Sequence, residues 1–308
     1  MLKKVFHFTV AFIALFTVVG ALASPVEAAD KPTVTVTTSF LQDMVKQIAG
    51  DTVNVELIIP AGGDPHLFVA KAQDIQKIQK ADLVLYHGLH FEGKMVEILE
   101  KSGVAVSKDF PQDKIGRMDE DGTEVVDPHF WFDTDLYKLA AQAAGQTLAE
   151  KFPDHKDEYL KNTENYLKQL DELKTWIDTE LAKLPADGRY LITPHDAFNY
   201  FSREFNFTVV APQGVSTDSE VSNEGIKSTV KFIIEHKVPA IFAESTTNPE
   251  RMKKLQEAAK SEGFDVKVVT GEGQELFSDS LAPVGQPGDN YIDMYKHNIK
   301  LIVDNLVK

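Results

Sequence analysis

Short apolar, strand-like runs alternate with helical stretches along most of the chain. In the first half we expect strands at 33–39, 53–60, 81–86 and 104–107, and helices at 72–79, 93–101 and 133–152. In the second half we expect strands at 190–193, 207–211, 240–243 and 266–270, and helices at 197–205, 223–236 and 249–262. This alternation is typical of βα units with mostly parallel sheets. The pattern predicts an α/β fold in both halves.

Between the halves, residues 156–184 carry one uninterrupted helical pattern. Its apolar side chains recur mostly at steps of three and four residues: Tyr159, Tyr166, Leu170, Leu173, Ile177, Leu181 and Leu184. No Gly or Pro interrupts it, and at ~1.5 Å per residue the helix would run roughly 40 Å. We predict two α/β lobes joined by one rigid helix. The alternative is a long surface helix of a single domain.

The first residues have the pattern of an export signal. Lys3 and Lys4 precede the uncharged, mostly apolar stretch 8–22, and small residues follow as far as Ala29. We therefore expect an exported protein, in the periplasm or at the cell surface. The predicted organisation is a signal peptide (1–29), an N-terminal lobe (30–155), a linking helix (156–185) and a C-terminal lobe (186–308).

Composition narrows the classes of partner. The net charge of −15 argues against nucleic acid and anionic membranes, and it is mildly favourable for a cation ligand. The chain has no cysteine, which excludes disulfides, thiolate metal ligands and a lipid-modified cysteine in this sequence.

Three Pro-His pairs are the main chemical signal: Pro65-His66, Pro128-His129 and Pro194-His195. With 9 histidines and 14 prolines in 308 residues, chance gives fewer than one such pair. Proline stiffens the backbone, so each imidazole is presented from a preorganised loop. His66 and His195 also follow predicted strands, and ligands gather at the carboxyl ends of strands in open α/β sheets. We predict that both lobes contribute to one transition-metal site.

The fourth ligand of such a site should be a carboxylate from the last quarter of the chain. Asp279 lies in a loop beyond the strand at 266–270, and Glu244 ends the strand at 240–243. Glu244 is either the competing ligand or an acceptor for an imidazole N–H. Asp196, like Asp64 and Asp127, flanks a histidine and is a candidate supporting carboxylate or a turn residue.

The remaining histidines and motifs favour binding over catalysis. His87 and His90 are weak candidates to line a cleft, whereas His155, His236 and His297 have the pattern of surface residues. The sequence has no His-Glu-x-x-His motif, nucleophile elbow or phosphate-binding glycine loop. Four protein ligands would also leave no open metal position for a substrate, so we predict that the chain is not an enzyme.

At these residues the chain resembles the metal-binding receptors of bacterial ABC importers for manganese and zinc. The resemblance covers essentially the whole chain after the signal. The matching segments are GGDPHLF (62–68), AKAQDIQKIQKADLV (70–84), DPHFWFD (127–133), TPHDAFNYF (193–201), APQGVSTDSEVS (211–222), ESTTNPERMKKLQEA (244–258) and TGEGQELFSDSLAP (270–283). The last four are especially similar to the MntA-type manganese receptors of Gram-positive bacteria.

The resemblance implies two α/β lobes joined by one long helix, with one divalent metal ion buried between them as cargo. It places the ligands on His66, His129, His195 and Asp279, and so favours Asp279 over Glu244. It also implies delivery to a membrane permease powered by a cytoplasmic ATPase, and we expect a monomer. Many Gram-positive members carry a lipid-anchored cysteine, but residues 21–25 contain none, which puts a lipid anchor in doubt.

The choice of metal and the rival functions complete the hypothesis. Intrinsic affinity favours Zn²⁺ over Mn²⁺, but a bidentate Asp279 would suit Mn²⁺ better. Zinc-specialised members of the resembled family often carry a histidine-rich loop before the second ligand, and its absence from residues 109–126 favours Mn²⁺. Ordinary imidazoles would lose the metal below about pH 6. The alternatives are a secreted metal-dependent hydrolase, with Glu244 or Asp279 as base, and a surface adhesin.

Overall fold

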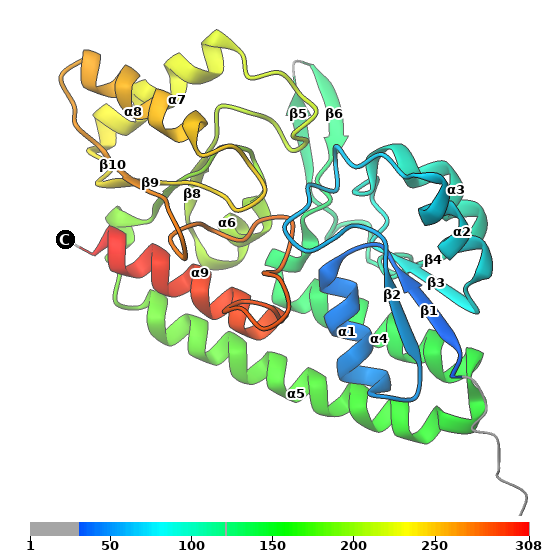
Figure 1. Cartoon of the computed structure of the whole chain (residues 1–308). Coiled ribbons are helices and arrows are strands. Elements are labelled where there is room, and N and C mark those ends of the chain that lie inside the picture. The colour runs from blue at the N-terminus through cyan, green and yellow to red at the C-terminus, as the bar shows by residue number, and fades with distance from the viewer. Residues whose placement is uncertain (1–30, 121, 308) are drawn as a thin grey trace, which may run out of the picture. The chain divides into compact units, whose positions relative to one another are not determined.

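The computed structural model describes residues 31–120 and 122–307. The predicted export signal at 1–29 lies outside these residues. The predicted α/β architecture, with two lobes and one long helix, is confirmed (Figure 1). Within the described residues, no helix is both long and apolar enough to cross a membrane.

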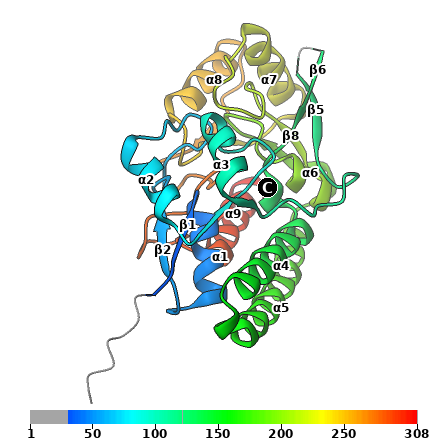
Figure 2. The ribbon, with the colours of Figure 1, turned by 90° about the vertical axis from the view of Figure 1, so that its right-hand side faces the viewer.

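The first lobe contains a four-stranded parallel sheet in the order β2-β1-β3-β4. Helix α1 packs on one face of this sheet, and α2 and α3 pack on the other (Figure 2). Such a change of face accompanies the change of direction in a right-handed, doubly wound sheet. The elements are β1 (Thr33–Val36), α1 (Ser39–Ala49), β2 (Asn54–Leu57), α2 (Ala72–Lys80), β3 (Leu83–Tyr86), α3 (Val96–Ser102) and β4 (Val104–Ala105).

The second lobe is built from two parallel strand pairs, β7–β8 and β9–β10. Single bridges extend both pairs towards the loops, from His195 to Gln213 and from Glu244 to Leu276. A separate apolar core lies between these strands and helices α7 and α8. The elements are β7 (Tyr190–Ile192), α6 (Asn199–Phe205), β8 (Thr208–Val210), α7 (Asn223–His236), β9 (Ala240–Phe242), α8 (Glu250–Ser261), β10 (Lys267–Val269) and α9 (Tyr291–Leu306).

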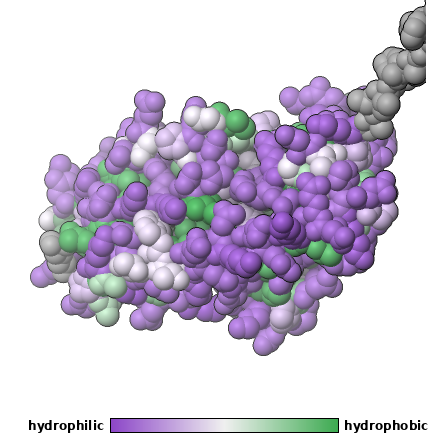
Figure 3. All heavy atoms as spheres, turned by 90° about the horizontal axis from the view of Figure 1, so that it is seen from below, coloured by the Kyte–Doolittle hydropathy of each residue, from purple (hydrophilic) through white to green (hydrophobic). Residues whose placement is uncertain are grey.

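The predicted long helix is α5 (Lys156–Leu181), and it packs against α1 and α4 (Thr134–Lys151) as well as against α9. All seven side chains of the predicted apolar stripe are buried. Close packing of α4 on α5 requires Gly145, because a Cβ atom there would lie 2.1 Å from Oγ1 of Thr163. The opposite face of α5 is exposed, and the corresponding surface is mainly hydrophilic (Figure 3). Helix α5 therefore supports elements of both lobes.

Two helices and two strands were absent from the sequence-based prediction. Helix α1 was not predicted, and its first residue, Ser39, was assigned to the end of the first strand. Helix α9 was not predicted either. Strands β5 (Arg117–Glu120) and β6 (Thr123–Val126) form an antiparallel hairpin in an otherwise parallel arrangement. The hairpin is rich in charged residues and mostly exposed, so it lacks the apolar alternation that marks a strand.

Candidate metal centre

The structure brings together His66, His129, His195 and Asp279, whose candidate ligand atoms all lie within 4.8 Å of one another. His66 follows β2, and His129 follows β6 of the hairpin. His195 follows β7, and Asp279 lies in the loop between β10 and α9. His66 is 6 % exposed, and the other three are fully buried. The loops at the carboxyl ends of strands thus meet between the lobes, as the α/β pattern predicts.

The distances between these atoms fit a common ion. The Nε2 atoms of His66 and His129 are 3.3 Å apart. The Asp279 oxygens lie 3.3 Å from Nε2 of His129, 3.2 Å from Nε2 of His195 and 3.8 Å from Nε2 of His66. Two ligand atoms at normal zinc distances and a tetrahedral angle would be about 3.4 Å apart. Among residues 31–120 and 122–307, neither Asp279 oxygen has a hydrogen-bond partner, so both are available to a cation.

Carboxylates hold two of the imidazoles from behind. Nδ1 of His129 lies 2.7 Å from Oδ1 of Asp127, which also accepts the backbone N–H of His129. Nδ1 of His195 lies 2.5 Å from Oε2 of Glu244. An N–H at Nδ1 leaves Nε2 facing the centre of the site, which is the usual arrangement for a metal-ligating histidine. Glu244 is therefore a partner of His195 on the side away from the cluster.

The other candidates occupy different positions. Asp196 is largely buried beside His195, and its Oδ1 has no hydrogen-bond partner within the described residues. Burial and then the Asp127 charge raise the pKa of Asp196 to about 6. His87 is buried and bonds Thr38 through Nε2, whereas His90 is exposed and lines a cavity next to His66. None of these three residues belongs to the four-residue cluster.

In the metal-free protein, one clustered histidine is neutral and the other two carry a positive charge. Burial lowers the pKa of His66 to about 3, so this imidazole is neutral. Burial would also lower the pKa of His129, but Asp127 and Asp279 outweigh it and raise this pKa to about 9. At His195, burial is likewise outweighed by Glu244 and Asp279, which raise the pKa well above its ordinary value. The two imidazolium charges outweigh burial at Asp279 and hold its pKa well below the usual range.

This arrangement predicts that the metal-free protein loses stability as pH rises from 7 to 9. A histidine whose pKa is raised by folding stabilises the folded state below its unfolded pKa of about 6.5. That contribution is lost as pH rises through the folded pKa, which is about 9 for His129. For His129 alone, we expect the free energy of unfolding to fall by about 2 kcal/mol over this range, and the raised pKa of His195 adds a loss of the same sign.

Urea denaturation at pH 7, 8 and 9 in the presence of a chelator would measure this loss. Asp127→Asn removes the charge behind His129 and should flatten the pH dependence. A metal-free protein whose stability is constant or rises from pH 7 to 9 would contradict the assigned charges.

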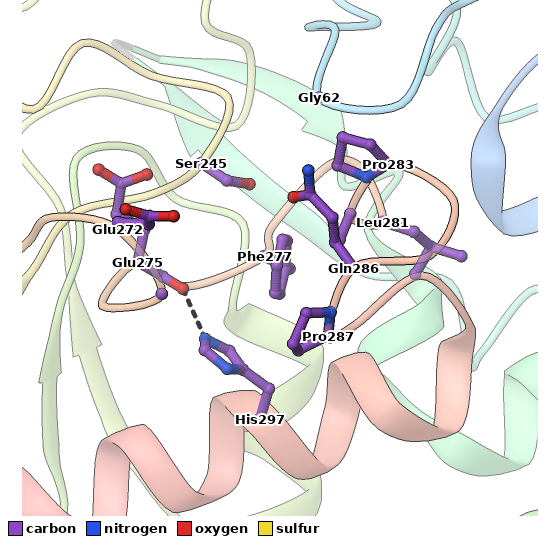
Figure 4. Close-up of a pocket in the computed structure, with 12 residues that line it drawn as sticks. Gly62, Ser245, Glu272, Glu275, Phe277, Leu281, Pro283, Gln286, Pro287 and His297 are labelled. Atoms are coloured by element: carbon purple, nitrogen blue, oxygen red, sulfur yellow. Dashed lines mark hydrogen bonds between the residues drawn. The ribbon is translucent and has the colours of Figure 1, made fainter.

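Aromatic side chains and two cavities surround the cluster. Phe91 packs edge-on against His66, and Trp131 packs against His129 and donates to the Ser278 carbonyl. A cavity of about 530 Å³ is lined by His66 and by residues of the β5–β6 hairpin. A second cavity of about 650 Å³ is lined by Phe277 and Leu281, on either side of Asp279, but by none of the four clustered residues (Figure 4). Of the four, only His66 therefore lines one of these cavities.

Residues 34–305 match the family described as zinc-uptake complex component A, periplasmic, or ZnuA. The chain belongs to the ZnuA family. Zinc-binding protein TroA of Treponema pallidum is 38 % identical over 294 residues, covering 94 % of this chain and 93 % of that protein. Manganese-binding lipoprotein MntA of Bacillus subtilis is 36 % identical over 278 residues, covering 89 % of each.

Solved structures agree with this assignment. A TroA structure with 63 % identity covers 90 % of this chain and all of its own, with a TM-score of 0.89. The periplasmic zinc-binding TroA of Treponema pallidum, at 37 % identity and the same coverage, has a TM-score of 0.85. The relatives named for zinc and for manganese have nearly the same sequence identity to this chain, 38 % and 36 %. Sequence identity therefore does not favour one metal over the other.

Family membership confirms the predicted class of protein. A Streptococcus mitis relative, 29 % identical over the full length of both chains, is named a manganese ABC transporter substrate-binding lipoprotein. ZnuA family proteins are extracytoplasmic binding components of ABC importers rather than enzymes. Neither the hydrolase nor the adhesin alternative finds support among these relatives.

Proposed function

We propose that this protein captures one divalent transition-metal ion between its lobes, with Mn²⁺ preferred over Zn²⁺. The ligands would be His66, His129, His195 and Asp279, with Glu244 and Asp127 orienting two of the imidazoles. The observation that carries the proposal is the convergence of three Nε2 atoms and both Asp279 oxygens in a buried site.

The preference for manganese rests on the geometry of Asp279. One of its oxygens approaches His129, and the other approaches His195 and His66. Since neither oxygen is engaged by the protein within the described residues, both can bind the same ion. Two carboxylate oxygens and three imidazoles make five ligand atoms, more than tetrahedral Zn²⁺ takes in a structural site. The site therefore suits Mn²⁺ better than its donor types alone suggest.

The remaining parts of the proposal concern organisation and delivery. The chain would act as an exported monomer that hands its ion to an ABC permease driven by a cytoplasmic ATPase. Residues 1–29 would be removed as a signal peptide. The N-terminal lobe (30–155) and the C-terminal lobe (186–308) would close around the ion, and the rigid linking helix (156–185) would limit their hinge motion.

Metal stoichiometry tests the proposal. The purified chain, stripped with a chelator and offered equal Mn²⁺ and Zn²⁺, should retain one ion per molecule by elemental analysis. His66→Ala should lose it, whereas His155→Ala should keep it. His155 is a matched control because its side chain is exposed and, among the described residues, hydrogen-bonds only Glu158 in the first turn of α5. Equal retention by the two variants, or none by the parent protein, would refute the proposed site, and an excess of Zn²⁺ would reverse the preference.

A further inference from the structure

The loop that carries His66 is tied to the second lobe by a hydrogen bond that involves no candidate ligand. Oδ2 of Asp64 accepts a hydrogen bond of 2.6 Å from Oγ1 of Thr217, a residue 153 positions away in the sequence. The other oxygen, Oδ1, accepts the backbone N–H groups of His66 at 2.9 Å and of Leu67 at 3.4 Å. One carboxylate therefore fixes the backbone of His66 and at the same time contacts the opposite lobe.

Thr217 is itself held firmly within the second lobe. Its side chain is 5 % exposed, and its backbone carbonyl accepts a hydrogen bond from the buried side chain of Gln213. Oε1 of Gln213 in turn accepts from Arg251 on α8, and the Gln213 backbone pairs with His195. A continuous chain of contacts thus runs from His66 through Asp64, Thr217 and Gln213 to His195. These contacts join a candidate ligand of one lobe to a candidate ligand of the other, and they do not involve the metal-binding atoms.

This bond lies beside the cavity that His66 lines. The cavity of about 530 Å³ is lined by His66 and by Val215, Ser216 and Asp218, which flank Thr217 in sequence. The segments between β2 and α2 and between β8 and α7 lie on the side of the molecule away from α5 (Figure 1). If α5 links the lobes, separation on opening is largest at this far side. A bond there must break before His66 moves away from the other three residues.

We propose that the Asp64–Thr217 hydrogen bond is an inter-lobe latch that sets how long the bound cation stays. This inference rests on the proposed function, because it requires a cation held by the four clustered residues. Thr217 is a positioning residue: it touches no ion and acts through Asp64 on the backbone of His66. Its loss should leave the number of bound ions unchanged and increase the rate at which the ion leaves.

Release kinetics of three variants test the latch. Thr217→Val removes the hydroxyl at nearly constant shape, and Thr217→Ser retains it. Ser216→Ala is the matched control, since Ser216 lines the same cavity and, within the described residues, its hydroxyl bonds only the backbone N–H of Asp218. Each full-length protein is loaded with one equivalent of Zn²⁺ and mixed with excess chromogenic chelator in a stopped-flow instrument. Losing a hydrogen bond to a charged acceptor should increase the rate of metal release roughly 10- to 100-fold.

We expect all variants to bind one Zn²⁺ and Thr217→Val to release it at least about 10-fold faster than the parent. Thr217→Ser and Ser216→Ala should stay within about 2-fold of the parent. Release from Thr217→Val within 2-fold of the parent, or equal acceleration in Ser216→Ala, would overturn the latch. Thr217→Ala removes the same hydroxyl and carries the test if the valine variant does not fold. Failure of the parent to bind Zn²⁺ would overturn the proposed function itself, and the stoichiometry reveals this before any rate is measured.

Discussion

Replacing Asp279 by asparagine should lower the affinity for Mn²⁺ and Zn²⁺ about 1000-fold. Asparagine has nearly the same shape, so the change isolates the negative charge. Asp279 is the only one of the four clustered residues with a negative charge, and its oxygens lie 3.2 to 3.8 Å from the Nε2 atoms of all three histidines. Because the site is buried, water cannot replace the missing charge, and breaking a buried charge pair costs about 3–5 kcal/mol.

Competition titration against a chelator of known affinity would measure this loss. Glu244→Gln provides the informative comparison, because Glu244 contacts His195 only at Nδ1. Loss of such a supporting carboxylate typically costs 10- to 100-fold in metal affinity. Asp218→Asn removes an exposed charge at the cavity rim and should change affinity less than about 2-fold. A larger loss in Glu244→Gln than in Asp279→Asn would make Glu244 the fourth ligand and refute the present assignment.

The sequence could predict which histidines converge because two of their loops follow predicted strands. His195 comes directly after a predicted strand, and His66 follows one after a short turn. Parallel strands bring their carboxyl ends to one edge of the sheet. The choice between Asp279 and Glu244 could not be made from position alone. Both follow strands of the same pair, and the bridge between Glu244 and Leu276 brings the two loops side by side. The two carboxylates differ in the direction of their side chains, because Glu244 contacts Nδ1 of His195, the nitrogen that faces away from the cluster.

Contacts between distant segments could not be predicted from the sequence, because they depend on how the chain folds. The carboxylate of Asp64 fits a local turn, and the sequence gives no sign that its second oxygen meets Thr217. The raised pKa of His129 has a similar origin. It depends first on Asp127, two residues away, and then on Asp279, which only the folded chain places there. The local residue pattern therefore predicts the three candidate histidine ligands. The choice of carboxylate, the charges and the inter-lobe contacts follow from the tertiary structure.

Those charges predict that metal binding releases about two protons at pH 7. In the metal-free protein, His129 lies between Asp127 and Asp279, and His195 lies between Glu244 and Asp279. Both imidazoles are protonated at pH 7 because these carboxylates raise their pKa values, to about 9 at His129. A divalent cation needs both Nε2 lone pairs, so it replaces two protons of the same total charge.

Because two protons compete with the ion, affinity should fall about 100-fold for each pH unit below pH 7.5. Ordinary imidazoles would instead hold the ion until about pH 6, so the flanking carboxylates move the onset of release upward. Isothermal titration calorimetry in buffers of different ionisation enthalpy would count the protons. Asp127→Asn, which leaves His195 unchanged, should reduce the count from about two to about one. An affinity independent of pH between 6.5 and 7.5 would mean that both imidazoles are neutral before the metal arrives, and the charge-exchange account would then fail.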